Sequence, residues 1–197
     1  MKRNTQRIRP HELAFDIDGV IADTFRAFVN TARESYGVPI EYEAITEYDF
    51  RKVIDIDDAT SDAIIEMILD DPLGIGISPV YGADRVLRRL SAFGPICLVT
   101  ARNNRDAIMK WVEATLGFED SDGLHLAATG SHEEKLPILL DRGIRFFVED
   151  RLETCYLIQE SPVTPIVFEQ PWNRKDHPFL SVKSWSEINE MVVWEDR

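Results

Sequence analysis

Two aspartates, Asp16 and Asp18, follow a short apolar run and are themselves followed by Gly19. Side chains two apart in an extended chain point the same way, so both carboxylates would project together from the end of a buried strand. Two carboxylates this close repel each other unless one is protonated or a cation lies between them. A hard, oxygen-ligated cation such as Mg²⁺ suits such a pair. An ordinary turn is the alternative interpretation, because aspartate and glycine are common turn residues.

Two further apolar runs also end in polar residues. One run stops at Thr100, and another stops at Glu149 and Asp150. Both runs have the length and flanking residues of buried strands. In an open parallel sheet, ligands bind at the carboxyl ends of the strands. We therefore expect these residues to meet the Asp16 pair at one edge of the sheet, a convergence that turn propensity alone does not predict.

Strands and helices alternate along most of the chain. Apolar runs bounded by glycine or proline predict strands, and apolar residues at helical spacing predict helices. We expect strands at 13–18, 95–100, 124–127, 144–148 and 165–168, and helices at 22–36, 58–70, 83–93, 133–142, 151–159 and 185–193, with one more helix capped by Asn103 or Asn104 that ends near 116. This alternation indicates an α/β fold with a Rossmann-like parallel sheet flanked by helices.

Residues 20–80 differ in character from the rest. They are acidic, hold one clear amphipathic helix at 58–70 and contain no strong strand signal. We therefore expect a small helical insert at 20–80, within an α/β core made of residues 1–19 and 81–197.

The composition limits the kinds of partner that the protein could bind. The chain has 197 residues, of which 44% are hydrophobic and 29% charged, as in soluble globular proteins. Its net charge of −13 argues against general binding to nucleic-acid polymers or anionic membranes, which requires a basic surface. A small anionic substrate stays possible, because a metal and a few local cations can reverse the field inside one pocket. The charge carries no information on oligomeric state.

The two cysteines and the absence of long apolar stretches bear on location. Cys97 and Cys155 lie in apolar surroundings with no Cys-x-x-Cys spacing, which favours buried free thiols in a reducing compartment. No apolar stretch approaches the length of a membrane span, and the basic N-terminus has no apolar segment behind it. We expect a cytoplasmic protein with no membrane partner.

Four features, namely three short stretches and one lysine, resemble in their order the signatures of the haloacid-dehalogenase-like (HAD) superfamily of phosphatases and phosphotransferases. They are Phe-Asp-Ile-Asp-Gly at 15–19, Leu-Val-Thr-Ala-Arg at 98–102, Lys135, and Phe-Val-Glu-Asp at 147–150. Each stretch alone is commonplace, whereas all four in order are specific. The resemblance implies a HAD-like core in which the helical insert is a small α-helical cap. Such a cap closes over the site, excludes water and selects the leaving group.

The resemblance also implies a role for each site residue. Asp16 would be the nucleophile that forms an aspartyl-phosphate. Asp18 would protonate the leaving oxygen and then deprotonate the hydrolytic water, and its presence favours a phosphatase over a dehalogenase. Asp16, the backbone carbonyl of Asp18, and Asp150 would hold Mg²⁺. Thr100 and Lys135 would bind the phosphoryl oxygens and neutralise their charge.

The sequence leaves two alternative roles open for each of two residues. Glu149 stands where relatives often carry aspartate or glycine. Its extra methylene leaves open whether it reaches the metal directly or through a water molecule. Arg102 would either contact the substrate phosphate or pair with the acidic residues around it.

A narrower resemblance concerns the substrate. The start Asp-Gly-Val-Ile-Ala-Asp and the stretch Val-Phe-Glu-Gln-Pro-Trp-Asn-Arg at 167–174 look like the cytosolic 5′(3′)-deoxyribonucleotidase type of 5′-nucleotidase. This favours a nucleoside or deoxynucleoside monophosphate. The aromatic residues of the insert would stack on its base or form the insert's own core; they are Phe25, Tyr42, Tyr48 and Phe50. The alternatives are a phosphatase for a sugar phosphate or phosphoglycolate, and a non-catalytic binding protein with the HAD fold.

Overall fold

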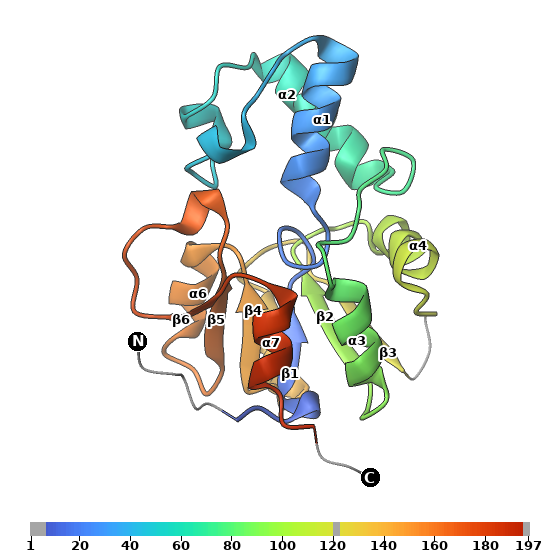
Figure 1. Ribbon diagram of the computed structural model, residues 1–197, viewed down its shortest axis with the longest axis vertical. Helices are drawn as coiled ribbons and strands as arrows, with labels where there is room; N and C mark the ends of the chain where they lie inside the picture. The colour runs from blue at the N-terminus through green and yellow to red at the C-terminus, as the bar shows by residue number, and fades with distance from the viewer. Residues whose placement is uncertain (1–6, 120–122, 195–197) are drawn as a thin grey trace.

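The computed structural model describes residues 7–119 and 123–194 of the chain. Within them, six parallel strands form one sheet in the order β3-β2-β1-β4-β5-β6 (Figure 1). The strands are β1 (Leu13–Phe15), β2 (Ile96–Thr100), β3 (Leu124–Ala128), β4 (Phe146–Glu149), β5 (Thr164–Phe168) and β6 (Leu180–Val182). β1 pairs with β2 on one side and with β4 on the other, so the strand order reverses direction at β1. β1 therefore lies at the topological switch point, where open α/β sheets bind ligands. The α/β fold class expected from the sequence is confirmed.

Helices cover both faces of the sheet (Figure 1). The α-helices of the described residues are α1 (Thr24–Tyr36), α2 (Asp58–Asp70), α3 (Ala83–Ser91), α4 (Arg105–Leu116), α5 (Lys135–Asp141), α6 (Leu152–Ile158) and α7 (Trp185–Met191). Phe15 and Leu98 pack with α3 and α7 in the larger apolar cluster. Ala14 and Phe147 face the other way, toward α5 and α6. This burial on both faces explains why the central strands are continuous apolar runs.

Several bounds differ from the sequence-based expectation. The first strand ends at Phe15 rather than at 18, because the chain turns away into a loop after Asp16. The α5 helix begins at Lys135, and Asn104 rather than Asn103 caps α4 by accepting a hydrogen bond from the Ala107 N–H. The edge strand β6 has only three residues and was not expected, because so short a stretch carries little strand signal.

Residues 24–70, from the start of α1 to the end of α2, form a separate helical layer beyond the carboxyl edge of the sheet (Figure 1). This layer, called the insert below, contains α1, α2 and the short 3₁₀ helices η2 (Tyr42–Ala44) and η3 (Phe50–Lys52). Its entering and leaving segments run side by side. The Asp23 N–H donates to the Ser78 carbonyl at 2.9 Å, and the Val80 N–H donates to the Ile21 carbonyl at 2.7 Å. The insert is thereby fixed above the switch point.

Two other expectations concern cysteines and membranes. Cys97 and Cys155 are both buried free thiols, as the sequence predicts. No helix in residues 7–119 and 123–194 has the length and apolar character needed to cross a membrane.

Candidate active site

The loop after β1 brings Asp16 and Gly19 against the end of β4. Asp16 is buried, and its Oδ1 accepts the Ile17 N–H at 2.8 Å. Gly19 has a φ of 71°, and a Cβ built there would lie 2.2 Å from Oδ2 of Asp150. A side chain at this position would therefore both strain the backbone and displace Asp150. The glycine after the two aspartates is required by the close approach of two strand ends.

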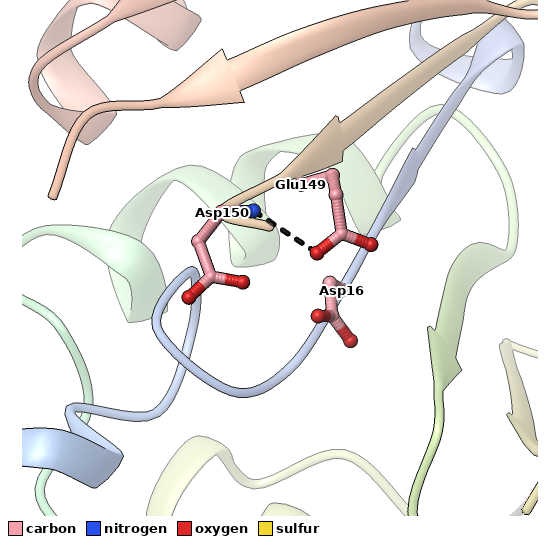
Figure 2. Close-up of side chains that lie close together, drawn as sticks. All are labelled: Asp16, Glu149 and Asp150. Atoms are coloured by element: carbon pink, nitrogen blue, oxygen red, sulfur yellow. Dashed lines mark hydrogen bonds between the residues drawn. The ribbon is translucent and has the colours of Figure 1, made fainter. Parts of the chain in front are cut away.

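Asp16, Glu149 and Asp150 form a compact carboxylate cluster (Figure 2). All three side chains are buried, and one oxygen from each lies within 4.8 Å of the others. Both oxygens of Glu149 already have partners, since Oε2 faces Lys135 and Oε1 accepts the N–H groups of Asp150 and Arg151. Oδ1 of Asp150, by contrast, is buried without a hydrogen-bond partner among the described residues. That orphaned oxygen fits a bound cation.

Lys135 lies between two of these carboxylates. Its Nζ is 3.0 Å from Oδ2 of Asp16 and 2.9 Å from Oε2 of Glu149, and its side chain is fully buried. Lys135 is the first residue of α5, where the helix dipole disfavours a cation. The two carboxylates therefore supply the stabilisation, because a buried ammonium requires paired negative charge.

Three carboxylates share one ammonium group in the cluster, and burial acts on all of them. Burial raises the pKa of Asp16 well above its usual range, the charge of Glu149 adds to the rise, and Lys135 opposes it. Burial, together with Glu149 and Asp16, likewise raises the pKa of Asp150. Burial also acts on Glu149, but Lys135 and the donated N–H groups outweigh it and lower the pKa. Hard oxygen donors with excess negative charge fit Mg²⁺.

Asp18 faces Arg102 rather than the carboxylate cluster. The Arg102 Nε donates to Oδ2 at 2.9 Å and Nη2 donates to Oδ1 at 2.7 Å, a bidentate ion pair. The Thr24 hydroxyl also donates to Oδ1. Burial works against ionisation of Asp18, but Arg102 outweighs it and holds the pKa below its usual range. Of the two assignments left open for Arg102, the structure shows the pairing with an acid.

Arg102 also connects the core to the insert. Its third donor, Nη1, reaches the Ile68 carbonyl on α2 at 2.8 Å. The Arg102 side chain is 3% exposed, so one buried guanidinium joins a strand-end aspartate to a helix of the insert. No pattern in the sequence predicts this contact with Ile68.

Thr100 is buried at the end of β2. Its hydroxyl accepts the Arg102 N–H at 3.2 Å, and its carbonyl accepts the N–H and the hydroxyl of Thr129. These bonds fix the strand end beside Asp16. The residues expected at three strand ends are therefore brought together, and Lys135 contacts two of them, Asp16 and Glu149.

A cavity of about 330 Å³ lies between the strand ends and the insert. Its floor is polar and includes Asp16, Asp18, Thr100 and Arg102. The insert contributes an apolar roof: Phe25, Phe28, Tyr48, Phe50, Ile65, Ile68 and Leu69. A small molecule with an anionic end and an apolar or aromatic end would match this division.

Four aromatic residues were expected either to stack on the substrate or to form the core of the insert. Three of them line the cavity and one does not. Phe25, Tyr48 and Phe50 line the cavity, while Phe25 and Phe50 also pack against each other with ring centroids 5.8 Å apart. Tyr42 does not line it; its hydroxyl donates to Oε1 of Gln170 at 2.8 Å.

His132 also lines the cavity. Its ring lies edge-on to Tyr48, with centroids 6.0 Å apart. Burial, together with the charges of Lys135 and Arg151, lowers its pKa to about 4. His132 is therefore neutral at pH 7. A single histidine in a loop has no spacing pattern that would single it out.

A comparison with family models gives one match that spans nearly the whole chain. Residues 9–196 match the model described as "5′ nucleotidase, deoxy (Pyrimidine), cytosolic type C protein". No curated protein matches the sequence of this chain.

Solved structures share the fold at low sequence identity. A haloacid dehalogenase-like hydrolase of Streptococcus pneumoniae has a TM-score of 0.57 at 11% identity, covering 90% of this chain and 96% of its own. A predicted phosphatase of Clostridium acetobutylicum has a TM-score of 0.58 at 14% identity, covering 90% and 95%. The β-phosphoglucomutase of Clostridium difficile has a TM-score of 0.50 at 18% identity, covering 92% and 96%.

Proposed function

Because the chain belongs to the cytosolic type C family of deoxy (pyrimidine) 5′ nucleotidases within the HAD superfamily of hydrolases, we propose that it is a Mg²⁺-dependent phosphomonoesterase acting on nucleoside or deoxynucleoside monophosphates. One observation carries the proposal. Asp16, Asp18 and Thr100 line the polar floor of a cavity whose apolar roof includes aromatic side chains. A phosphate would lie on the floor and a base against the roof.

In the proposed reaction Asp16 is the nucleophile. A carboxylate oxygen of Asp16 attacks phosphorus, and the bond from phosphorus to the leaving oxygen breaks as Asp18 donates a proton to that oxygen. Because Arg102 favours the ionised form of Asp18 in this structure, the step requires Asp18 to take up a proton when the substrate binds. Water then attacks the aspartyl-phosphate, Asp18 takes a proton from this water, and Asp16 is regenerated as phosphate leaves. Thr100 and Lys135 bind the phosphoryl oxygens, and Lys135 is already positioned 3.0 Å from Asp16.

The metal would be held by Asp16, the backbone carbonyl of Asp18, and Asp150. When bound, Mg²⁺ would neutralise charge on the phosphoryl group. We assign Glu149 a different task, because both of its oxygens already have partners among Lys135 and two backbone N–H groups. Glu149 orients Lys135 rather than contacting the metal directly.

Residues 20–80 would act as the cap and residues 1–19 and 81–197 as the core. The cap's apolar roof excludes water from the phosphoryl group and selects the leaving group. Arg102 joins this roof to the core by donating to the Ile68 carbonyl. The family description also supports a cytosolic location and a small phosphorylated substrate.

Phosphate release from a panel of esters tests the proposal. The panel holds deoxynucleoside and nucleoside monophosphates, hexose phosphates and phosphoglycolate, each with Mg²⁺ and with EDTA. Mg²⁺-dependent release from the nucleotides, lost in Asp16→Asn and kept in a control variant of an exposed aspartate, Asp84→Asn, supports it. Release only from sugar phosphates or phosphoglycolate would retain the mechanism and reject the nucleotide. No release from any ester would favour a binding role for the fold.

A further inference from the structure

The turn after β5 contacts the carboxylate cluster at Asp150. It comprises Gln170 and the short 3₁₀ helix η4 (Pro171–Asn173), and all of its side chains are buried. The Trp172 indole N–H donates to Oδ2 of Asp150 at 3.0 Å. The Asn173 amide donates to the Asp150 carbonyl at 2.7 Å and to the Phe168 carbonyl at 2.8 Å.

These bonds distinguish the two oxygens of Asp150. Trp172 engages Oδ2, whereas Oδ1 is buried and without a partner among the described residues. Asn173 fixes the backbone of the same residue. An unpaired buried carboxylate oxygen is costly unless it faces a cation. The turn therefore determines which oxygen of Asp150 is presented to the cluster and limits rotation of the carboxylate.

The same turn contacts the nucleophile loop and the insert. The Gln170 amide donates to the Gly19 carbonyl at 2.7 Å, and its oxygen accepts the Tyr42 hydroxyl at 2.8 Å. The Trp172 ring packs on Phe25 of α1, with centroids 4.2 Å apart. Aromatic contact and hydrogen bonds thus hold the turn in place from the side of the insert.

We propose that the Gln170–Asn173 turn is a positioning element that sets the metal affinity of the cluster, with the Trp172 indole N–H orienting Asp150. The inference rests on the proposed function, because it presumes that Asp150 is a metal ligand. Groups that hydrogen-bond a metal ligand fix its orientation, and their loss typically weakens metal binding about 10- to 100-fold.

Mg²⁺ titration of the protein without substrate tests this inference. Binding is measured by calorimetry and by the Mg²⁺-dependent rise in melting temperature. Trp172→Phe keeps an aromatic ring and removes the N–H, and we expect Mg²⁺ affinity to fall about 10- to 100-fold. Trp111→Phe is the matched control, because the buried Trp111 indole donates to the Ile77 carbonyl at 2.8 Å, outside the cluster. It should lose stability but keep Mg²⁺ affinity.

A second variant removes a contact between the insert and the turn. Tyr42→Phe removes the hydroxyl that holds Gln170 and should weaken Mg²⁺ binding on the order of two- to fivefold, the effect of one neutral hydrogen bond. Wild-type affinity in both Trp172→Phe and Tyr42→Phe would overturn the inference; if Trp172→Phe does not fold, wild-type affinity in Tyr42→Phe overturns it alone. Absence of Mg²⁺ binding in the wild type would instead reject the proposed function itself.

Discussion

Replacing Arg102 with methionine removes the buried cation that joins Asp18 to the insert. Methionine keeps an unbranched side chain but supplies no hydrogen-bond donor. The variant loses two bonds to Asp18 and one to the Ile68 carbonyl. Asp18 then keeps only the Thr24 hydroxyl as a side-chain partner among the contacts described above.

The structure sets the size of the effect. Removing one partner of a buried ion pair costs about 3–5 kcal/mol. The Asp18 side chain is 25% exposed, so water can solvate part of the abandoned charge and the lower end applies. We expect the free energy of unfolding to fall by about 3 kcal/mol. For a chain of this length, that loss corresponds to a fall in Tm of roughly 6–12 °C.

Activity should fall as well, because Asp18 is no longer held in place. A displacement of about 1 Å in a catalytic group costs roughly 10²-fold in rate. The assays are thermal unfolding at pH 7 in EDTA and phosphate release with Mg²⁺. Arg102→Lys keeps the charge and loses the bidentate geometry, so it should fall between wild type and Arg102→Met.

Arg51→Met is the matched control in the insert. Arg51 pairs with Asp58 and Asp62, whose side chains are 84% and 67% exposed. Exposed pairs contribute about 0–1 kcal/mol, and the bond from Arg51 Nε to the Ser61 hydroxyl adds about 1 kcal/mol, so this substitution should cost clearly less than Arg102→Met. If Arg102→Met and Arg51→Met lost the same stability, the reasoning that Arg102 joins the core to the insert as a buried ion pair would be refuted.

Three other substitutions probe the site. Lys135→Met leaves Asp16 and Glu149 buried without a cation and should lower the free energy of unfolding by about 3–5 kcal/mol, as measured by urea unfolding in EDTA; added Mg²⁺ should recover part of the loss. Asp18→Asn should lower kcat about 10²- to 10⁴-fold on a deoxynucleoside monophosphate, and much less on p-nitrophenyl phosphate, whose leaving group needs no proton. His132 has a folded pKa of about 4, below its unfolded value of about 6.5, so the unfolded chain binds more protons and stability is lost as pH falls through this range. Wild type should therefore lose about 1 kcal/mol more than His132→Gln between pH 7 and pH 5, after allowance for solvent screening, in urea unfolding at both pH values.

For each of these three substitutions, one experimental outcome would contradict the prediction. A Lys135→Met protein as stable as wild type would mean that the buried carboxylates hold no net charge to balance. Equal losses on both esters in Asp18→Asn would argue against proton donation to the leaving group. The same pH dependence in wild type and His132→Gln would show that this histidine does not titrate differently on folding.

The strand-end residues could be predicted because the pattern is local. Asp16, Thr100 and Asp150 follow apolar runs, and parallel strands place their carboxyl ends at one edge of the sheet. Lys135 followed only from the family resemblance, since one lysine at the start of a helix has no periodicity of its own. The structure places its Nζ 3.0 Å from Oδ2 of Asp16, and its role at the phosphoryl group stays a prediction.

Contacts between the insert and the core could not be predicted. The bond from Arg102 to the Ile68 carbonyl joins residues 34 apart in sequence, and the bond from Tyr42 to Gln170 joins residues 128 apart. Both depend on how α1 and α2 are placed above the sheet, which hydrophobic periodicity does not encode. The same limit applies to Trp172, whose partner Asp150 is known only once β4 and the turn after β5 are adjacent.

The most direct test of the account is whether Asp16 carries the phosphoryl group during turnover. A deoxynucleoside monophosphate labelled in its phosphate is mixed with the protein and Mg²⁺, the reaction is quenched in acid within milliseconds, and the label on the chain is located. The account predicts label on the peptide that contains Asp16, with none on Asp16→Asn. Phosphate release without label on the chain, or turnover by Asp16→Asn at the wild-type rate, would contradict it.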